Sequence, residues 1–378
     1  MFTYVSSRLA SINHMRGPWR PLVAGALLLV PVAGLGAATL LRAPPTRYEV
    51  RNLVSDQPGR ADVTDPNLVN AWGIVPNPTG PWWVSDNGTD LSTLYNEHGA
   101  INSLVVTIPG GRPTGIVFNS GTDFVVHNGA ASGPSAFIFA SEAGIISGWS
   151  PAVPPPPPSH QAQVAVPDEG KGAIYKGLAL ASTASGDRLY TTDFHNGSVE
   201  VYDNTFAEIE TDGEFEDDDL PAGFAPFGIA AINGKIYVSY AMQDADAEDD
   251  VAGKGLGYVN VFDTDGHMLR RLISRGRLNA PWGMVLAPGN FGDFSGDLLV
   301  GNFGDGRINA YDPDTGDYHG TLKQPRGGFV EIEGLWGLAF GNGFAAGPTN
   351  VLFFSAGPDD EEHGLFGSIT ATTPGHSH

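Results

Sequence analysis

The sequence contains no cysteine among its 378 residues. Disulfide bonds, thiolate metal sites and a cysteine nucleophile are therefore excluded. Charged residues are also scarce, at 16% of the chain, and no window shows the apolar period of a long surface helix. Glycine and proline are abundant instead, with 51 and 29 residues. This composition is typical of a turn-rich globular protein with few surface helices.

Basic residues are few and unevenly placed. All 42 acidic residues follow residue 48, where they face only 15 of the 20 basic residues, so this part of the chain carries a net charge of −27. Such a charge argues against nucleic acid and against anionic membrane surfaces as partners. It favours solubility and attracts cations or basic ligands, but it identifies none of them.

One uncharged run is long enough to cross a membrane, "PLVAGALLLVPVAGLGAATLL" at residues 21–41, and three arginines precede it. A basic flank followed by an apolar run is typical of an export signal, and about 20 apolar residues can also remain as an anchor. We therefore expect residues 1–42 to be a signal peptide or membrane anchor and residues 43–47 a linker. The acidic body is then exported: periplasmic, secreted or held at the outer face of the inner membrane, with membrane contact only through the N-terminal segment.

From residue 48 onward, short runs such as "PWWVSD", "SVEVYD" and "NVLFFSA" alternate with Gly, Asn, Asp and Pro clusters. A motif in which glycine stands between a preceding residue, often aromatic, and an aliphatic one recurs six times. Its glycines are Gly73, Gly115, Gly177, Gly228, Gly283 and Gly337. Their spacing, 42 to 62 residues, accommodates four strands and their loops. The pattern predicts an all-β fold, a six-bladed β-propeller with four-stranded blades in one domain over residues 48–370, followed by a disordered tail at 371–378.

Turn chemistry and one spare strand refine this prediction. The similar stretches "SDNG" (85–88), "TDFHNG" (192–197) and "GNFGDG" (301–306) predict hairpins between the second and third strands of units one, three and five. The sixth unit lacks an outer strand, whereas "YEVRNLV" (48–54) has no partner. We therefore expect the N-terminal strand to close the ring. An extra "DFVVHN" strand and a long hairpin, residues 241–257, interrupt units two and four.

Long motifs between Asn52 and Ile369 resemble one known family. They include "TDPNLVNAWGI", "YKGLALA", "DVAGKGLGYVNVFDTDG", "GNFGDGRINAYDP" and "GPDDEEHGLFGSI". The family comprises exported bacterial β-propeller proteins of uncharacterised function, some with a C-terminal PEP-CTERM sorting tail. The resemblance implies a fold and export but no reaction. Because the printed sequence ends in "TATTPGHSH", that sorting tail is not expected here.

The chain is more distantly similar in architecture to NHL-type and senescence-marker or gluconolactonase-type six-bladed propellers. The latter similarity implies Asn and Asp ligands for a divalent cation beside the inner-strand glycines. This sequence has Trp, Thr, Lys or Phe immediately before those glycines. Indole and phenyl rings offer no oxygen to a hard cation, so that ligand set is not expected.

In a propeller, the starts of the inner strands and the hairpins between second and third strands surround one mouth of the central channel. Candidate ligand-binding residues on this face are Trp72, Lys176, Phe227, Trp282, Trp336, Asp86 and Asn302. They either pack between blades and cap turns, or line one pocket that binds a small organic or carbohydrate ligand through stacking and polar contacts. If they line a pocket, at least two of the three tryptophans keep exposed ring surface.

Two other function classes stay open. A hydrolase of the lactonase or esterase type would need an acidic or histidine site on the same face, for which Asp193 and His195 are the candidates. No familiar catalytic motif supports them. Alternatively, the chain is a protein-interaction scaffold of the cell envelope without a small-molecule site, since propellers host many functions.

The long hairpin of the fourth unit carries the run "DADAEDD". Asp244, Asp246 and Glu248 alternate along it, and alternating carboxylates can converge on one Ca²⁺. The spacing fails the EF-hand requirements for glycine at the sixth position and glutamate at the twelfth. A solvated acidic loop is the alternative interpretation.

Overall fold

The computed structural model describes residues 45–372. The expected signal or anchor segment, residues 1–42, lies outside the described residues, as do residues 373–378. In the described range, all regular structure is β-strand apart from two 3-10 turns, η1 (Asn87–Thr89) and η2 (Gly292–Phe294). Within this range no helix has the length and hydrophobicity needed to span a membrane.

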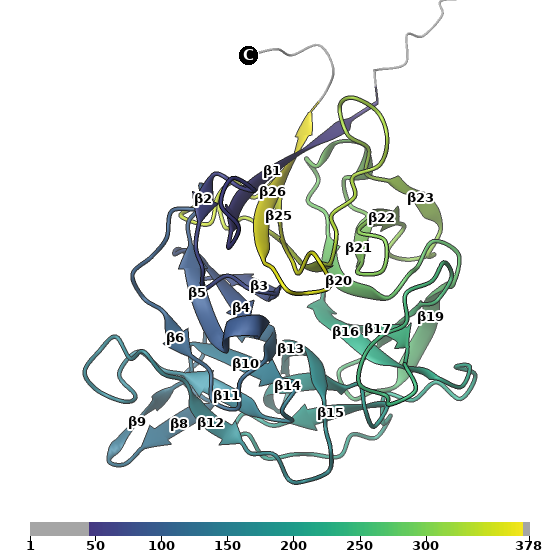
Figure 1. Ribbon diagram of the computed structural model, residues 1–378. Coiled ribbons are helices and arrows are strands. Elements are labelled where there is room, and N and C mark those ends of the chain that lie inside the picture. The colour runs from purple at the N-terminus through teal and green to yellow at the C-terminus, as the bar shows by residue number, and fades with distance from the viewer. Residues whose placement is uncertain (1–44, 373–378) are drawn as a thin grey trace, which may run out of the picture. The chain divides into compact units, whose positions relative to one another are not determined.

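Six small sheets are arranged around a common centre as the blades of a β-propeller (Figure 1). The fold class predicted from the six glycine motifs is confirmed. From inside to outside, blade 1 consists of β3 (Ala71–Pro76), β4 (Trp82–Asp86), β5 (Leu91–Tyr95) and β6 (Val106–Thr107). Blade 2 consists of β7 (Pro113–Phe118), β10 (Phe137–Ser141), β11 (Ile146–Trp149) and β12 (Gln163–Val166).

The next three blades follow in chain order. Blade 3 consists of β13 (Tyr175–Thr183), β14 (Gly186–Asp193) and β15 (Ser198–Tyr202). Blade 4 consists of β16 (Phe224–Ile232), β17 (Lys235–Met242), β18 (Tyr258–Phe262) and β19 (Met268–Ser274). Blade 5 consists of β20 (Pro281–Leu286), β21 (Leu298–Asn302), β22 (Ile308–Tyr311) and β23 (Tyr318–Thr321).

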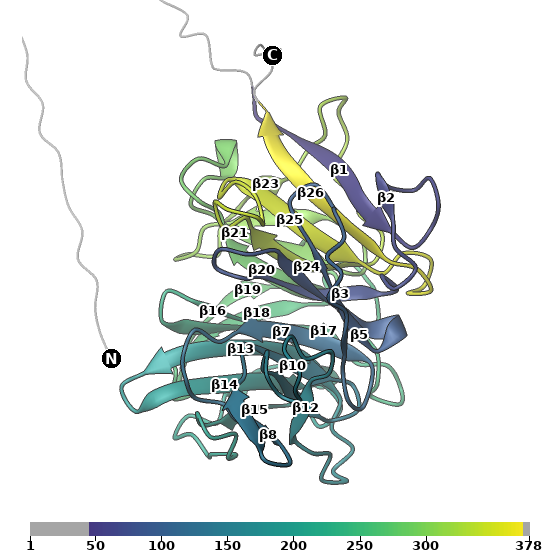
Figure 2. The ribbon, with the colours of Figure 1, turned by 90° about the vertical axis from the view of Figure 1, so that its left-hand side faces the viewer.

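Blade 6 joins the two ends of the described chain. Its inner strands are β24 (Leu335–Phe340), β25 (Val351–Ala356) and β26 (Leu365–Thr372). The N-terminal strand β1 (Arg47–Ser55) pairs antiparallel with β26, from Arg47 opposite Thr372 to Ser55 opposite Leu365 (Figure 2). The predicted closure of the ring is confirmed. A further short strand, β2 (Val63–Thr64), adds to β1 in parallel, so this sheet has five strands.

Two blades depart from the regular pattern. Blade 3 has three strands, because the segment after β15 contacts it only through a bridge between Tyr202 and Glu208. That segment is rich in Asp and Glu, which are poor strand formers. In blade 2 the predicted extra strand is present as β8 (Val125–Asn128), which pairs with β9 (Ala131–Pro134) in a separate hairpin.

The recurring glycines lie where neighbouring inner strands approach most closely. A Cβ atom placed on Gly337 would lie 2.8 Å from the carbonyl oxygen of Trp72, and one on Gly177 would lie 3.0 Å from that of Phe227. The other four glycines face the next inner strand at similar or closer range. Only glycine fits such a contact, so the repeated motif follows from the close packing of six strands around one axis.

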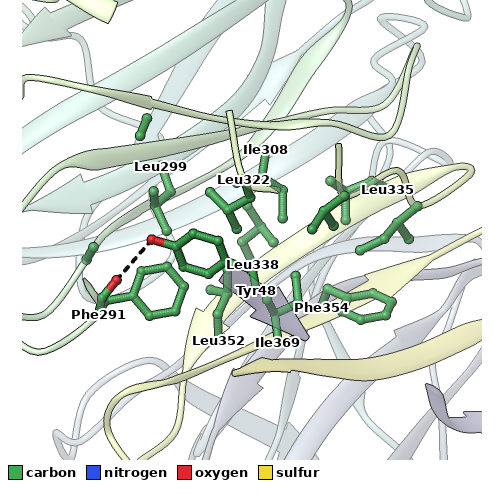
Figure 3. Close-up of a cluster of buried hydrophobic side chains, with 14 of the residues drawn as sticks. Tyr48, Phe291, Leu299, Ile308, Leu322, Leu335, Leu338, Leu352, Phe354 and Ile369 are labelled. Carbon is green, nitrogen blue, oxygen red and sulfur yellow. Dashed lines mark hydrogen bonds between the residues drawn. The ribbon is translucent and has the colours of Figure 1, made fainter. Parts of the chain in front are cut away.

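The apolar core lies between neighbouring blades. Figure 3 shows the cluster between blades 5 and 6, which includes Leu299, Leu335 and Phe354. Tyr48 of β1 enters this cluster with 1% of its surface exposed, and its hydroxyl donates to the carbonyl of Phe291 at 3.2 Å. The closing strand is therefore held by side-chain packing as well as by its pairing with β26.

Candidate functional site

Six aromatic side chains fill the mouth of the central channel, and we call them the aromatic plug. They are Trp72, Phe194, Phe227, Trp282, Phe303 and Trp336. Trp336 lies among the others: its ring stacks on Trp72 at 3.7 Å and on Phe303 at 4.1 Å, and meets Phe227 and Trp282 edge to face. The inner-strand motif therefore brings its aromatic residues together on one face.

The aromatic plug is a packed cluster and not an open collar. Trp72 and Trp336 are each 1% exposed, and Phe227 is fully buried. The expectation that at least two tryptophans keep exposed ring surface is therefore wrong. Rings that converge on one axis from different blades have room only to stack on one another. Trp282 alone of the three is partly exposed, and it lines a cavity of about 100 Å³ in the channel.

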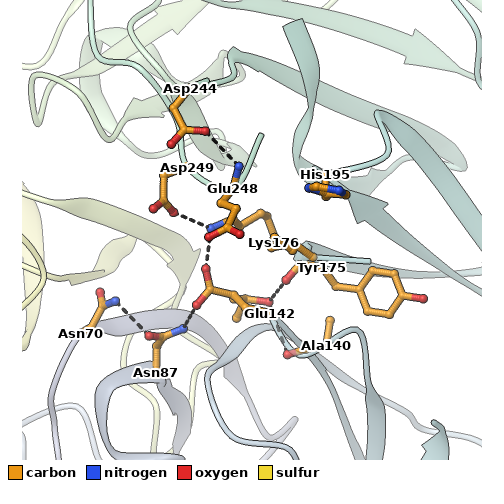
Figure 4. Close-up of polar contacts among 12 residues, drawn as sticks. Asn70, Asn87, Ala140, Glu142, Tyr175, Lys176, His195, Asp244, Glu248 and Asp249 are labelled. Atoms are coloured by element: carbon orange, nitrogen blue, oxygen red, sulfur yellow. Dashed lines mark hydrogen bonds and ion pairs between the residues drawn. The ribbon is translucent and has the colours of Figure 1, made fainter. Parts of the chain in front are cut away.

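Lys176 is the polar member of the inner ring and is almost completely buried, with 2% of its side chain exposed. Its ammonium forms an ion pair with Glu142 and a second one with Asp249, at 3.0 Å (Figure 4). It also lies 5.2 Å from the ring centre of Trp72. Burial alone lowers the pKa of Lys176, but Glu142 and Asp249 outweigh burial, and the pKa lies above its ordinary value. Lys176 is therefore a fixed positive charge.

A chain of amides connects this ion pair to the aromatic plug. Asn87 donates from Nδ2 to Glu142 at 3.0 Å, and Asn70 donates to Asn87 at 3.2 Å. The indole of Trp336 in turn donates to Asn70 at 3.0 Å. Charged, amide and aromatic groups at the mouth thus form one connected network, which restricts each side chain to one orientation.

Two further carboxyl groups face Lys176. Burial raises the pKa of Asp250 to about 7, partly opposed by Lys176 and increased by Asp249. Burial likewise raises the pKa of Glu361 to about 7, against Lys176 and together with Glu142. Asp250 and Glu361 come from blades 4 and 6 and are both partly exposed. Two carboxyl groups at the mouth thus pair directly with the ammonium of Lys176, and two more, with pKa values raised to about 7, lie within reach of its charge.

The hairpin geometry explains why Glu142 reaches the mouth. The residue that follows the second strand donates its backbone N–H to the backbone carbonyl of the residue directly before the inner strand of the same blade. Such hydrogen bonds join Asn87 to Asn70, Glu142 to Arg112, Phe194 to Ile174 and Phe303 to Ala280, at 2.9 to 3.1 Å. Asn87, Glu142, Phe194 and Phe303 are therefore equivalent positions, two polar and two aromatic. Comparison of these positions across the repeats is the sequence signal that could have identified Glu142.

Glu361 sits on a strained turn. Asp359, Asp360 and Glu361 have φ angles of 57°, 51° and 65°, three successive left-handed residues that are not glycine. Each such residue costs roughly 1 kcal/mol or more. Strain of this kind concentrates at functional sites, so the turn makes Glu361 a candidate functional residue.

The long hairpin of blade 4 lies against blade 3. Gln243 donates to the carbonyl of Phe194 at 2.6 Å, the ring of His195 bonds to the carbonyl of Ala247 at 3.2 Å, and Asp249 reaches Lys176. In this position the hairpin carries Asp249 and Asp250 to the mouth. The sequence indicated that the run was acidic, but not that its last two residues face Lys176.

The predicted calcium ligands of this hairpin are not gathered as a site. Asp244 accepts the backbone N–H of Glu248 at 3.0 Å, and backbone hydrogen bonds, that of Glu248 foremost, lower its pKa. Asp246 and Glu248 are exposed. Within residues 45–372 no three His, Cys, Asp or Glu side chains are grouped as a metal would require. A Ca²⁺ ion bound by Asp244, Asp246 and Glu248 stays a prediction.

The acid–base candidates are near the mouth but separate. The carboxylate of Asp193 accepts the backbone N–H groups of Ile174 and Asn196 and the side-chain amide of Asn196, so it caps its own turn. Among the described contacts, no hydrogen bond or ion pair joins Asp193 to His195. Asp86 and Asn302 are both completely buried, and a ligand at the surface does not reach them without movement.

The mouth thus combines an excess of negative charge with two groups that titrate near pH 7. Such an arrangement can bind a cationic group, and it can accept or donate a proton at neutral pH.

Sequence comparisons give relatives that are viral. No protein-family model matches the chain. The chain is 35% identical over 343 residues to the uncharacterised protein R648 of Acanthamoeba polyphaga mimivirus, covering 86% of this chain and 80% of that protein. It is 34% identical over 344 residues to the uncharacterised protein L690 of the same virus, covering 85% of each. These names carry no function, and they give no support to a bacterial setting or a PEP-CTERM tail.

A structural comparison supports the fold. A solved structure described as a candidate gluconolactonase covers 89% of this chain and 97% of its own, with a TM-score of 0.53 and 16% sequence identity. Similarity at this identity shows the six-bladed architecture alone. The sequence identities of a third or more over most of both proteins show more: this chain belongs to the same protein family as the mimivirus proteins R648 and L690.

Proposed function

We propose that the protein binds a small organic ligand with a positively charged group, such as an amino sugar, at the mouth of its central channel. The observation that carries this proposal is the gathering of Glu142, Asp249, Asp250 and Glu361 around the single ammonium of Lys176. Three negative charges remain uncompensated when all four carboxyl groups are ionised. A cationic ligand would relieve the repulsion among them.

The contacts differ from those expected from the sequence. The rings of Trp72, Phe227 and Trp336 are buried and hold the mouth in shape, so the ligand contacts fall to the carboxylates. Asp249 is the most accessible of these groups, with 73% of its side chain exposed. Hydroxyl groups of a carbohydrate suit Asn87 and Glu142, which are already joined by a hydrogen bond from the Asn87 amide to the Glu142 carboxylate. A carbohydrate with an amino group combines both requirements.

Calorimetric titration with glucosamine tests the proposal, with glucose as the neutral probe of the same shape. We expect saturable binding of glucosamine, little binding of glucose, and tighter binding as the pH rises from about 5.5 to about 7, because Asp250 and Glu361 become ionised while the amino group of the sugar stays protonated. Asp249→Asn should weaken binding about tenfold, whereas Glu362→Gln, an exposed acid on the neighbouring turn, should leave it unchanged. Equal binding of both sugars, or no binding of glucosamine or simple amines at millimolar concentration, would refute it.

A second function, a hydrolase of the lactonase or esterase type, is favoured by the raised pKa values alone. A carboxyl group with a pKa near 7 is poised to act as a general acid or base. Asp250 and Glu361 meet this condition. Asp193 is a weaker candidate, because its carboxylate accepts hydrogen bonds within its own turn. A lactone and ester screen of the parent protein and of Glu361→Gln, with and without EDTA, tests this function. Hydrolysis unchanged by Glu361→Gln would contradict the assignment.

Export is the third part of the proposal, and it rests on the apolar run at residues 21–41 behind a basic flank. We propose a periplasmic, secreted or membrane-anchored location, by analogy with the exported bacterial propellers that the motifs resemble. Fractionation of cells that express the full chain, compared with a chain lacking residues 1–42, tests it. If no small molecule binds, the remaining interpretation is a protein-interaction scaffold of the cell envelope.

A further inference from the structure

A fully buried aspartate side chain without a hydrogen-bond partner lies in blade 1, directly before Asn87. Asp86 ends β4, and its side chain is 0% exposed. Neither of its carboxylate oxygens has a hydrogen-bond partner. An isolated carboxylate is one of the most costly groups to bury, so it must be neutralised by a proton, a cation or a basic partner. No ion pair in the described part of the chain reaches it.

The residues that share the face of Asp86 are also polar. In the pairing of β4 with β5, Thr93 lies opposite Val84 and Tyr95 opposite Trp82, so Asp86, Thr93 and Tyr95 point to the same side of blade 1. Thr93 is 1% exposed and its hydroxyl oxygen has no hydrogen-bond partner either. Thr93 lies close enough to Asp86 for its hydroxyl and backbone N–H to lower the pKa of that carboxyl group, but neither side chain has a partner at normal hydrogen-bond geometry.

A second buried carboxylate, that of Asp65, lies next to Tyr95. The hydroxyl of Tyr95 donates to Asp65 at 2.9 Å, and Asp65 is itself 2% exposed. Its other oxygen accepts the backbone N–H of Asn67 at 3.0 Å. Burial foremost, and the negative charge of Asp65, raise the pKa of Asp86 well above its ordinary value, although Thr93 opposes them. Two buried carboxylates thus lie near Thr93 and Tyr95, and no ion pair of the described residues includes either of them.

We propose that Asp86, Asp65, Thr93 and Tyr95 form an internal site for one hard divalent cation, such as Ca²⁺. The four side chains supply six oxygen atoms, and such cations take six to eight oxygen ligands. A divalent charge balances two carboxylates. A shared proton would neutralise only one of them, and it would leave at least one of the unpartnered oxygens without a ligand.

The position of this site gives the cation a structural role. Asp65 directly follows β2, which pairs with the closing strand β1, whereas Asp86 belongs to blade 1. The backbone N–H of Asp65 also donates to Ser55, the last residue of β1, at 3.0 Å. A cation between the two carboxylates would link the N-terminal closure segment to blade 1. This site is separate from the hairpin of Asp244, Asp246 and Glu248.

Metal analysis and thermal unfolding of the full chain test the inference. After dialysis against buffer with micromolar Ca²⁺, we expect about one Ca²⁺ per chain by mass spectrometry, and a fall of several degrees in Tm with EDTA. In Asp86→Asn the metal content should drop to background, and EDTA should no longer change Tm. Asp297→Asn is the matched control, a 7% exposed aspartate of blade 5 that also has one unpartnered oxygen. It should keep the metal.

A second variant guards against misfolding. Thr93→Val keeps the shape of the side chain and removes one oxygen, so it should weaken Ca²⁺ binding about tenfold or more while leaving Tm in EDTA nearly unchanged. Absence of metal in the parent protein together with a Tm that EDTA leaves unaltered would overturn the inference in favour of a protonated Asp86. Metal retained in Asp86→Asn and lost in Asp244→Asn, Asp246→Asn would overturn it in favour of the hairpin.

Discussion

Replacement of Glu361 by glutamine should stabilise the protein at high pH and do little at low pH. In the folded protein the pKa of this carboxyl group is raised to about 7, from about 4.5 in an unfolded chain. The folded state therefore binds the proton more tightly than the unfolded state. Stability contributed by this group is present at low pH and is lost as the pH rises from about 4.5 to about 7. Glutamine stays neutral throughout and avoids that loss.

The magnitude follows from the two pKa values. A tenfold change in proton affinity corresponds to about 1.4 kcal/mol, so a rise from 4.5 to about 7 corresponds to about 3.5 kcal/mol at most. Partial exposure of Glu361 to solvent reduces this figure. We expect Glu361→Gln to gain about 1 to 2 kcal/mol in unfolding free energy, relative to the parent protein, between about pH 5.5 and pH 8.

Urea denaturation at the two pH values measures this gain. Glu362→Gln is the control, because the neighbouring side chain is exposed and its replacement should shift stability equally at both pH values. A difference between Glu361→Gln and the parent that does not grow with pH would show that Glu361 is ionised at no cost. Burial and the neighbouring carboxylates would then not raise its pKa.

The remaining predictions concern packing and backbone geometry. Tyr48→Ala should cost about 3 to 5 kcal/mol in unfolding free energy, because the buried ring holds the closing strand, whereas Tyr48→Phe should cost only about 1 kcal/mol for one hydrogen bond. Trp336→Ala should cost a similar 3 to 5 kcal/mol by chemical denaturation, and an unchanged stability would mean that the aromatic plug is not packed. Gly337→Ala should destabilise or prevent folding, since its Cβ would lie 2.8 Å from a backbone oxygen. Asp360→Gly should instead raise Tm, because glycine adopts its φ of 51° without strain.

The fold was predictable because its main requirement, glycine where the inner strands approach one another, is visible at single positions of the sequence. Six inner strands can pack around one axis only if each carries glycine at the point of closest approach. That requirement leaves six glycines in regular order along the chain. The closing strand was equally predictable, since an unpaired edge on β26 and an unused apolar run at residues 48–54 each need a partner. Blade 3 lacks a fourth strand in the structure. Whether its acidic segment pairs with β15 depends on charge repulsion weighed against backbone hydrogen bonding, and no short motif encodes that balance.

The site was less predictable because it depends on side chains from different blades. Trp72 and Trp336 are 264 to 283 residues along the chain from their partners in the network, and only the closed ring shows that they stack. Lys176 was identified from its place before a glycine, yet its partners Glu142 and Asp249 lie in hairpins of irregular length. Sequence spacing gave no measure of burial, so it could not separate a packed aromatic cluster from an open pocket.

The equivalent positions of the repeats show where such a site can arise. After the second strand, blades 3 and 5 have Phe194 and Phe303, which pack into the aromatic plug. At the same position, blade 2 has Glu142, which pairs with Lys176, and blade 1 has Asn87, which donates to Glu142. The backbone geometry is the same in all four, with one N–H donated at 2.9 to 3.1 Å. Packing therefore explains the aromatic half of the mouth, but a buried ammonium among carboxylates contributes little net stability compared with apolar residues of similar size. The polar half of the mouth, which includes Asn87, Glu142 and Lys176, is therefore not explained by a contribution to stability. A ligand is most reasonably sought at this half.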